Sequence, residues 1–169
     1  MNALVKSVAS SVNALSSMLN RVCWLTASAF MLVMLATVAL QVITRYVFFS
    51  PPSWTEELAR YCMIWAGYLG ATVAFYRSED PVLLNPDKIR QGAVSKLSLV
   101  LRSVAVLLFM VPVLYWSPVI IGHHMIRETE SMELISGYIM LIIPLFSAVI
   151  LIHMFARLIN GFTNYRFSE

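Results

Sequence analysis

The sequence predicts an all-α integral membrane protein with four transmembrane helices, forming one membrane domain over residues 1–169. Of its 169 residues, 59% are hydrophobic and 12% are charged, and the mean hydropathy is +0.76. A soluble domain of this size could not bury so much apolar surface in one core, whereas lipid accommodates helices that are apolar on all sides. Four long stretches also contain no charged residue, at 22–44, 61–76, 103–122 and 134–156.

The first twenty residues carry apolar side chains three or four positions apart, which predicts a weakly amphipathic helix over 1–20. This helix could lie on the membrane surface or extend the first span into solvent, and a frayed terminus is the third alternative. The charge-free stretch that follows is too long for the apolar region of a cleaved signal peptide, so we expect the first helix to be retained. The apolar residues are Leu4, Val8, Val12, Leu15 and Leu19.

The first span is expected at about residues 22–48 and the second at about 54–76, with a proline-bearing turn between them. Ser53 and Glu56 match a capping box at the start of the second helix. In such a box the serine hydroxyl accepts a hydrogen bond from the Glu56 amide, and the glutamate carboxylate accepts one from the Ser53 amide. The helix that starts there is about 34 Å long at the usual rise, which is enough to cross a membrane.

The third span is expected at about 97–121 and the fourth at about 134–156. Both contain proline, which has no amide hydrogen and clashes with the preceding helical turn. Pro112 and Pro118 should therefore bend or end the third helix, and Pro144 should kink the fourth.

Basic residues indicate how the spans are oriented. Nine of the twelve Lys and Arg residues fall on the side of the two termini, and three fall on the other side. Connections rich in Lys and Arg stay in the cytoplasm, so both termini are predicted to be cytoplasmic. The three basic residues on the opposite side are Arg45, Arg60 and Arg127.

A dense charge cluster stands at the non-cytoplasmic boundary of the first two spans. It consists of Arg45, Glu56, Glu57 and Arg60, and Trp54 belongs to the same corner. One interpretation is structural, because acids in the first turn of a helix gain about 0.3 to 1 kcal/mol from the helix dipole. The other is a salt-bridged corner that ties the first helix to the second and presents a rigid surface to another subunit.

The second helix also carries small residues at every fourth position, which allow another helix to approach closely. The approaching helix could belong to this chain or to a partner. One row consists of Ala66, Gly70 and Ala74, and the neighbouring row consists of Gly67 and Ala71.

The sequence lacks the motifs of several functional classes of protein. The net charge of +3 comes from scattered residues and forms no basic stripe for nucleic acid. Cys23 and Cys62 stand alone in apolar stretches, which does not suggest a disulfide framework or a redox motif. No catalytic triad, HExxH motif, phosphate loop or dinucleotide motif is present, so we expect neither an enzyme nor a cofactor. His123 and His124 lie at the opposite end of the predicted bundle from His153, which disfavours a haem between them.

The membrane interior of the predicted bundle carries no charge. Around Val33, Leu69, Phe109 and Phe146 the helices offer only weakly polar side chains. Ion-coupled carriers and proton relays normally keep ionisable or unwound polar sites at this depth. The chain is therefore a poor candidate for a transporter or exporter acting alone.

Three segments near the second span have a specific pattern. They read Thr44-Arg45-Tyr46-Val47-Phe48, then Trp54-Thr55-Glu56-Glu57-Leu58-Ala59-Arg60-Tyr61, then Trp65-Ala66-Gly67-Tyr68-Leu69-Gly70-Ala71. This order resembles the small membrane subunit (the DctQ-type, or Q, subunit) of TRAP transporters, which are tripartite ATP-independent uptake systems. The match is strongest over 45–77. It departs from the family after the second span, where a histidine followed by alternating apolar residues and an acid is common. Here the sequence reads Asp80-Pro81-Val82-Leu83-Leu84-Asn85.

The resemblance implies a multi-pass subunit of the bacterial inner membrane that binds a large membrane subunit. That partner would carry an organic solute with sodium, and a periplasmic substrate-binding protein would deliver the solute. The small subunit would stabilise the stationary scaffold and contact membrane lipids, and the residues that select the solute would lie on other polypeptides. The alternative function is a four-helix membrane anchor of a haem or quinone redox complex.

Overall fold

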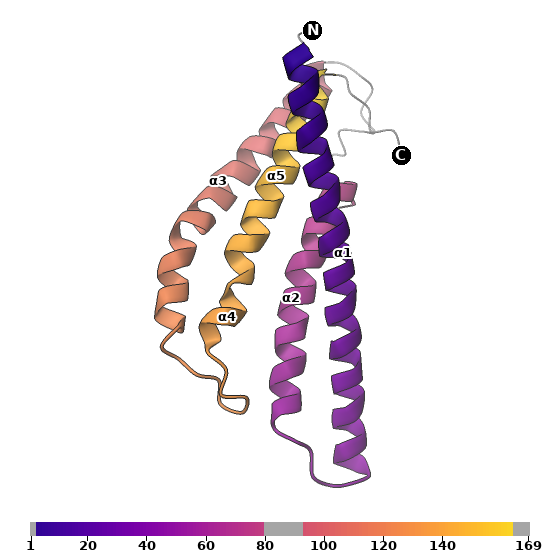
Figure 1. Ribbon diagram of the computed structural model, residues 1–169, viewed down its shortest axis with the longest axis vertical. Helices are drawn as coiled ribbons and strands as arrows, with labels where there is room; N and C mark the ends of the chain where they lie inside the picture. Colours follow the sequence, from indigo (N-terminus) through magenta and orange to yellow (C-terminus); the bar gives the residue numbers. More distant parts are fainter. Residues whose placement is uncertain (1–2, 80–92, 164–169) are drawn as a thin grey trace.

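The computed structural model describes residues 3–79 and 93–163. Its helices are α1 (Ala3–Tyr46), α2 (Trp54–Arg77), α3 (Ala93–His124), α4 (Ser136–Met140) and α5 (Ile142–Thr163). In these ranges α1 and α3 run in one direction, and α2, α4 and α5 run in the other (Figure 1). Within these ranges the chain forms helices and turns but no strand, apart from an isolated bridge between Glu128 and Ile135. The predicted all-α fold class is confirmed.

Within residues 3–79 and 93–163, three helical segments are long and apolar enough to cross a membrane. They cover Ala9–Tyr46, Leu97–His124 and Ser136–Gly161. The second predicted span forms α2, whose bounds agree with the prediction to within one residue. It is not among the three, so a fourth crossing by α2 stays a prediction.

The N-terminal segment continues directly into the first span. α1 is one helix of 44 residues, about 66 Å long at the usual rise. The structure thus agrees with the second of the three alternatives for residues 1–20, an extension of the first span, and shows no separate surface helix in its described part. The start of α1 stands beyond the other helices at one end of the molecule (Figure 1).

The predicted capping box at the start of α2 is wrong. Ser53 has helical backbone angles (φ −62°, ψ −32°), and its side chain makes no capping hydrogen bond. An N-cap serine needs an extended backbone to turn its hydroxyl toward the first free amides. Thr55 is engaged in this turn instead, since its hydroxyl donates to the Pro52 carbonyl at 2.7 Å.

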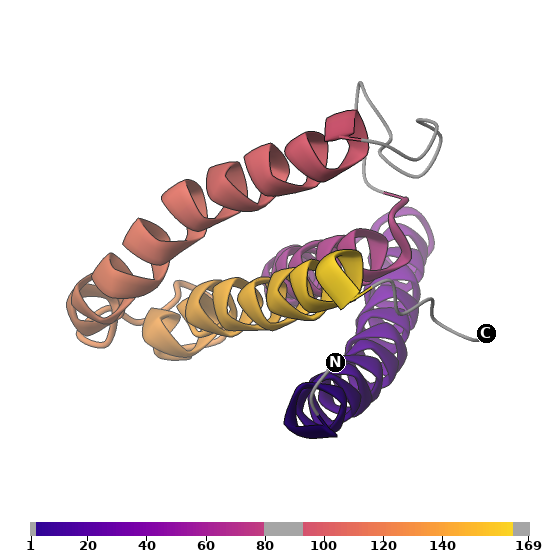
Figure 2. The same cartoon turned by 90° about the horizontal axis from the view of Figure 1, so that it is seen from above.

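The prolines have different effects in the two later spans. α3 continues through Pro112 and Pro118 and is bowed rather than ended (Figures 1 and 2). The fourth span is divided at Leu141 into α4 and α5. Pro144 explains this break, because it has no amide hydrogen for the carbonyl of Met140. The predicted kink in the fourth span is confirmed.

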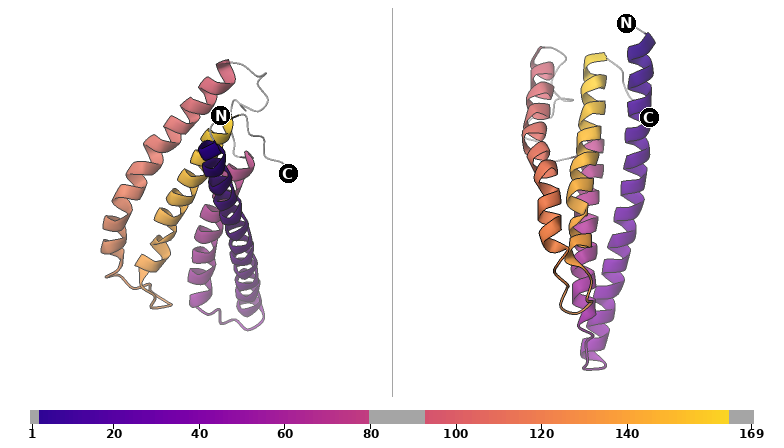
Figure 3. Two further views of the ribbon diagram at one scale, coloured as in Figure 1. Left: turned by 45° about the horizontal axis from the view of Figure 1, so that its top comes forward. Right: turned by 60° about the vertical axis from the view of Figure 1, so that its left-hand side comes forward.

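α5 lies in the middle of the molecule, between α3 on one side and the α1–α2 pair on the other (Figures 2 and 3). Two apolar clusters hold this arrangement together. Cys23 of α1, Leu69 and Val73 of α2, and Ile142 of α5 form the first. Phe75 of α2 with Ile150 and Met154 of α5 form the second, on which α3 packs Val106 and Leu107.

Candidate functional site

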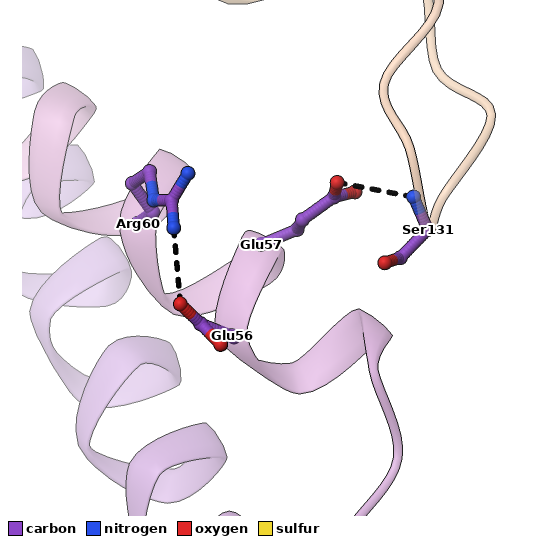
Figure 4. Close-up of polar contacts among 4 residues, drawn as sticks. All are labelled: Glu56, Glu57, Arg60 and Ser131. Atoms are coloured by element: carbon purple, nitrogen blue, oxygen red, sulfur yellow. Dashed lines mark hydrogen bonds and ion pairs between the residues drawn. The ribbon is translucent and has the colours of Figure 1, made fainter.

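The first turn of α2 carries the acidic residues that the sequence singled out (Figure 4). Arg60 donates to the Glu56 carboxylate at 3.1 Å, one helical turn away. The two side chains remain 57% and 69% exposed, respectively. An exposed pair of this kind contributes only about 0.3–0.5 kcal/mol, so it orients two charges on the surface of α2 without anchoring another helix.

Glu57 makes the long-range contact of this turn. Its carboxylate accepts backbone hydrogen bonds from Ser131 and Met132, each at 3.0 Å. Both amides belong to the loop between α3 and α4, which Figure 4 shows reaching toward the glutamate. Hydrogen bonds to a charged acceptor are stronger than neutral ones, so Glu57 fastens this loop to the start of α2.

The predicted salt-bridged corner between α1 and α2 is not formed. Among the described residues, Arg45 makes no ion pair with Glu56 or Glu57. The last turns of α1 extend beyond the start of α2 (Figure 1). Arg45 belongs to the last turn of α1 and is exposed. Trp54 begins α2 and is 40% exposed. Arg60 has its partner within its own helix, and the link made by Glu57 runs to the α3–α4 loop.

The small residues of α2 divide between two environments. Ala66 is buried, while Gly70 and Ala74 are half-buried and Gly67 and Ala71 are exposed. A Cβ atom added at Gly67 or at Gly70 would meet nothing within 4 Å. The packing of this chain therefore does not require glycine at either position.

A polar seam that sequence analysis did not predict joins α1 to α5. The side-chain amides of Asn13 and Asn160 form two reciprocal hydrogen bonds of 2.9 and 3.0 Å. Below them, the Ser16 hydroxyl and Nδ1 of His153 share a hydrogen bond of 2.7 Å, and both side chains are buried. The ring of Tyr76 packs on the His153 ring with centroids 5.1 Å apart.

Arg157 of α5 caps the end of α2. Its guanidinium donates to the carbonyl of Phe75 and, at 2.9 Å, to the hydroxyl of Ser78. Ser78 ends α2 in a left-handed conformation with φ of 58°. A cation at a helix C-terminus neutralises the free carbonyls and the negative end of the dipole. The guanidinium of Arg157 also lies 4.6 Å from the centroid of the Phe75 ring.

The sequence held a usable signal for the seam. On α1, Asn13, Ser16 and Asn20 recur at helical spacing on one face, and on α5 His153 and Asn160 lie seven positions apart. Two polar stripes on otherwise apolar helices predict that the stripes face each other. The Glu57 contact had no such signal, because its partners are backbone amides that any residue supplies.

Comparison with known families adds to this geometry. A sequence model described as "Tripartite ATP-independent periplasmic transporters, DctQ component" matches residues 34–164. This chain belongs to the DctQ family. The match includes α2 and its Glu57 contact, all of α3, α4 and α5, and the last part of α1. As a DctQ component, the chain is a part of a transporter, and the resemblance inferred from the motifs around α2 is confirmed.

A curated relative points to the same transporter class. A segment is 36% identical over 73 residues to the sialic acid TRAP transporter permease protein SiaT of Haemophilus influenzae (strain 86-028NP). The match covers 40% of this DctQ chain and 12% of that protein, so the relative is far longer than the segment it shares.

DctQ membership does not support the alternative of a haem or quinone anchor. His123 and His124 end α3, and the Nδ1 atom of His153 is engaged by Ser16. In the described part of the chain, no group of three or more His, Cys, Asp or Glu side chains could hold a metal ion.

Proposed function

We propose that this DctQ component is the static scaffold subunit of a sodium-coupled uptake system in the bacterial inner membrane. It would form a single membrane domain with both termini in the cytoplasm. Its work would be to bind and stabilise a large membrane subunit, which transports an organic solute delivered by a periplasmic binding protein. The observation that carries this proposal is an exposed face of α2 whose glycine has no role within the chain.

This face, here called the Gly67 face, consists of Met63, Gly67 and Ala71. A glycine inside a helix costs about 1 kcal/mol relative to alanine. Among the described residues nothing offsets that cost at Gly67, because the space beside it is open. Close approach of a helix from another subunit would offset it, since small residues let two backbones pack tightly in lipid.

The positions of the charged residues suggest which subunit handles the ion and the solute. The four charge-free stretches at 22–44, 61–76, 103–122 and 134–156 leave no Asp, Glu, Lys or Arg at mid-depth. A sodium-coupled carrier needs polar or unwound sites there. The solute and the ion would therefore be handled by the partner, and this chain would supply apolar helices that enlarge the stationary part of the complex.

The much longer relative supports a membrane partner. In that permease protein, the segment that matches this chain is part of one polypeptide with a far larger remainder. A segment joined covalently to a permease in one protein is expected to contact its permease where the two are separate chains.

With both termini in the cytoplasm, the Glu57-held loop would lie on the periplasmic side. α1 begins and α5 ends at the same end of the molecule (Figure 1), and the connections at that end carry most of the basic residues. By the positive-inside rule that end is cytoplasmic. The loop between α3 and α4 then faces the periplasm, where the substrate-binding protein arrives.

The Gly67 face can be tested with two matched glycines. Gly122 near the end of α3 also has open space beside it. Gly67→Leu should leave the chain folded but reduce copurification of the large subunit by tenfold or more, because the leucine holds the partner helix away. Gly122→Leu should leave the yield of complex unchanged. Equal yields for the two variants would overturn the assignment of the Gly67 face.

A further inference from the structure

Two polar atoms near the α1–α5 seam are buried without a hydrogen-bond partner. They are Oδ1 of Asn20 and Nε2 of His153, and neither is paired with any residue that the structure describes. His153 is almost completely buried, with 3% of its surface exposed. A buried polar atom that makes no hydrogen bond is costly, so most such atoms are paired with the protein or with an ordered water.

Ser16 brings the two unpaired atoms into the same part of the interface. Its hydroxyl shares a hydrogen bond of 2.7 Å with Nδ1 of His153, so Nε2 is no more than one imidazole ring away. Asn20 follows Ser16 by four residues in α1, and side chains at this spacing are neighbours, with Cβ atoms about 5–6 Å apart. Helical side chains also lean toward the N-terminus of their helix, which directs the Asn20 carboxamide toward the turn of Ser16.

We propose that Asn20 and His153 hold a buried water molecule at this place. Two hydrogen bonds of about 2.8 Å through one water connect atoms up to about 5.6 Å apart, a distance similar to that between neighbouring helical side chains. The Asn20 oxygen only accepts, so its partner must donate. The Nε2 atom donates or accepts according to the histidine tautomer. Water suits both tautomers, because it can donate two hydrogen bonds and accept two.

The surroundings favour water over a cation. A cation between helices needs negatively charged ligands, and in the described ranges no group of three or more His, Cys, Asp or Glu side chains could hold a metal ion. Arg157 lies one turn beyond His153 on α5, and its positive charge would repel a cation. A neutral water pairs the two atoms without adding charge to the interface.

Water can reach this place from the membrane boundary. Asn20 is half-buried although its carboxamide oxygen is covered, and Arg21 beside it is exposed. The charge-free stretch 22–44 begins after Arg21, and the stretch 134–156 ends before Arg157. The site therefore lies where the apolar layer meets the headgroups, and a water need not cross the membrane interior to enter it.

Solid-state NMR of the full chain in liposomes tests the site. His123→Gln and His124→Gln together leave His153 as the chain's only histidine, so isotope-labelled histidine reports this ring alone. Magnetisation transferred from water to the ring should give a cross-peak in this parent chain. Asn20→Leu should lower its intensity about fivefold or more, because an apolar site stays dry. Ser17→Leu is the matched control, since it places the same side chain at an exposed position of α1 and should leave the cross-peak unchanged.

A further variant separates loss of the water from disturbed packing. Asn20→Ser keeps an acceptor in a smaller side chain and should retain more of the cross-peak than Asn20→Leu. A resolved ring signal without a water cross-peak in the parent chain would overturn the proposal. Full intensity in Asn20→Leu, or an equal loss in Ser17→Leu, would overturn the role of Asn20. Because every measurement uses this chain alone, the result does not depend on whether it binds a large subunit.

Discussion

The Glu57 carboxylate receives two backbone amides from a loop more than seventy positions away in sequence. Its neighbour Glu56 differs, because it faces Arg60 on the surface of the same helix. The two adjacent glutamates therefore have separate roles. Glu57 links α2 to the α3–α4 loop, whereas Glu56 makes a contact within α2. Sequence reasoning grouped them as one cluster, since charge and spacing alone do not show which carboxylate points toward the loop.

This difference between the two glutamates predicts their mutational effects. Glu57→Ala should increase amide hydrogen exchange at Ser131 and Met132 by about tenfold or more, because each amide loses a charged acceptor worth about 1.5–3 kcal/mol. Glu56→Ala should leave exchange in the loop unchanged, since Glu56 does not contact it. Exchange measured by mass spectrometry on the full chain distinguishes these results. Equal effects from the two variants would contradict the assigned roles.

At the scale of elements, α1 is tied to α5 by polar groups as well as by apolar packing. Asn13 and Asn160 exchange two hydrogen bonds, and Ser16 contacts His153 one turn further along. A buried amide without a hydrogen-bond partner is costly, so each partner restricts where the other helix can lie. The seam thereby fixes the register of α1 against α5.

The asparagine pair should show strong coupling in a double-mutant cycle. Asn13→Leu or Asn160→Leu alone should lower the free energy of unfolding by about 1 kcal/mol, because the remaining amide loses its partner. The double variant should cost less than the sum of the two, since it leaves no amide unpaired. Reversible unfolding in mixed detergent micelles provides the measurement. Additive losses would show that the two amides act independently.

Sequence patterns located the helices more successfully than the contacts between them. The bounds of α2 and the break near Pro144 follow from local chemistry, namely a proline-bearing turn and a missing amide hydrogen. The unbroken α1 was one of three alternatives, because the same apolar spacing suits a surface helix and an extension of a span. The corner with Arg45 was wrong because its geometry depends on how far α1 extends past α2, which residue spacing does not encode.

At the scale of the whole molecule, the chain exposes apolar side chains along α1 and α3, and α5 packs against each of the other long helices. Such an open arrangement leaves much of α1, α2 and α3 free to contact lipid or protein. This shape agrees with the scaffold role proposed above.

The absence of charge at mid-depth predicts the behaviour of the isolated chain. Reconstituted alone into sodium-loaded vesicles, it should accumulate no solute, because the four charge-free stretches carry no Asp, Glu, Lys or Arg that could bind an ion within the apolar layer. Adding the large subunit and the binding protein should establish uptake, and leaving out this chain should abolish uptake without changing solute capture by the soluble component. Radiolabelled solute inside the vesicles is the readout. Uptake with the large subunit and binding protein alone would contradict the scaffold role.

The length of α1 has a mechanical consequence. A bilayer with its headgroups is about 40–45 Å thick, so a helix of about 66 Å rises about 20 Å above it when upright. A rigid rod of that height works as a lever. A change of about 10° in the tilt of α1 at the membrane surface moves its N-terminal end sideways by about 3–4 Å. A small change of tilt within the lipid therefore produces a measurable movement outside it.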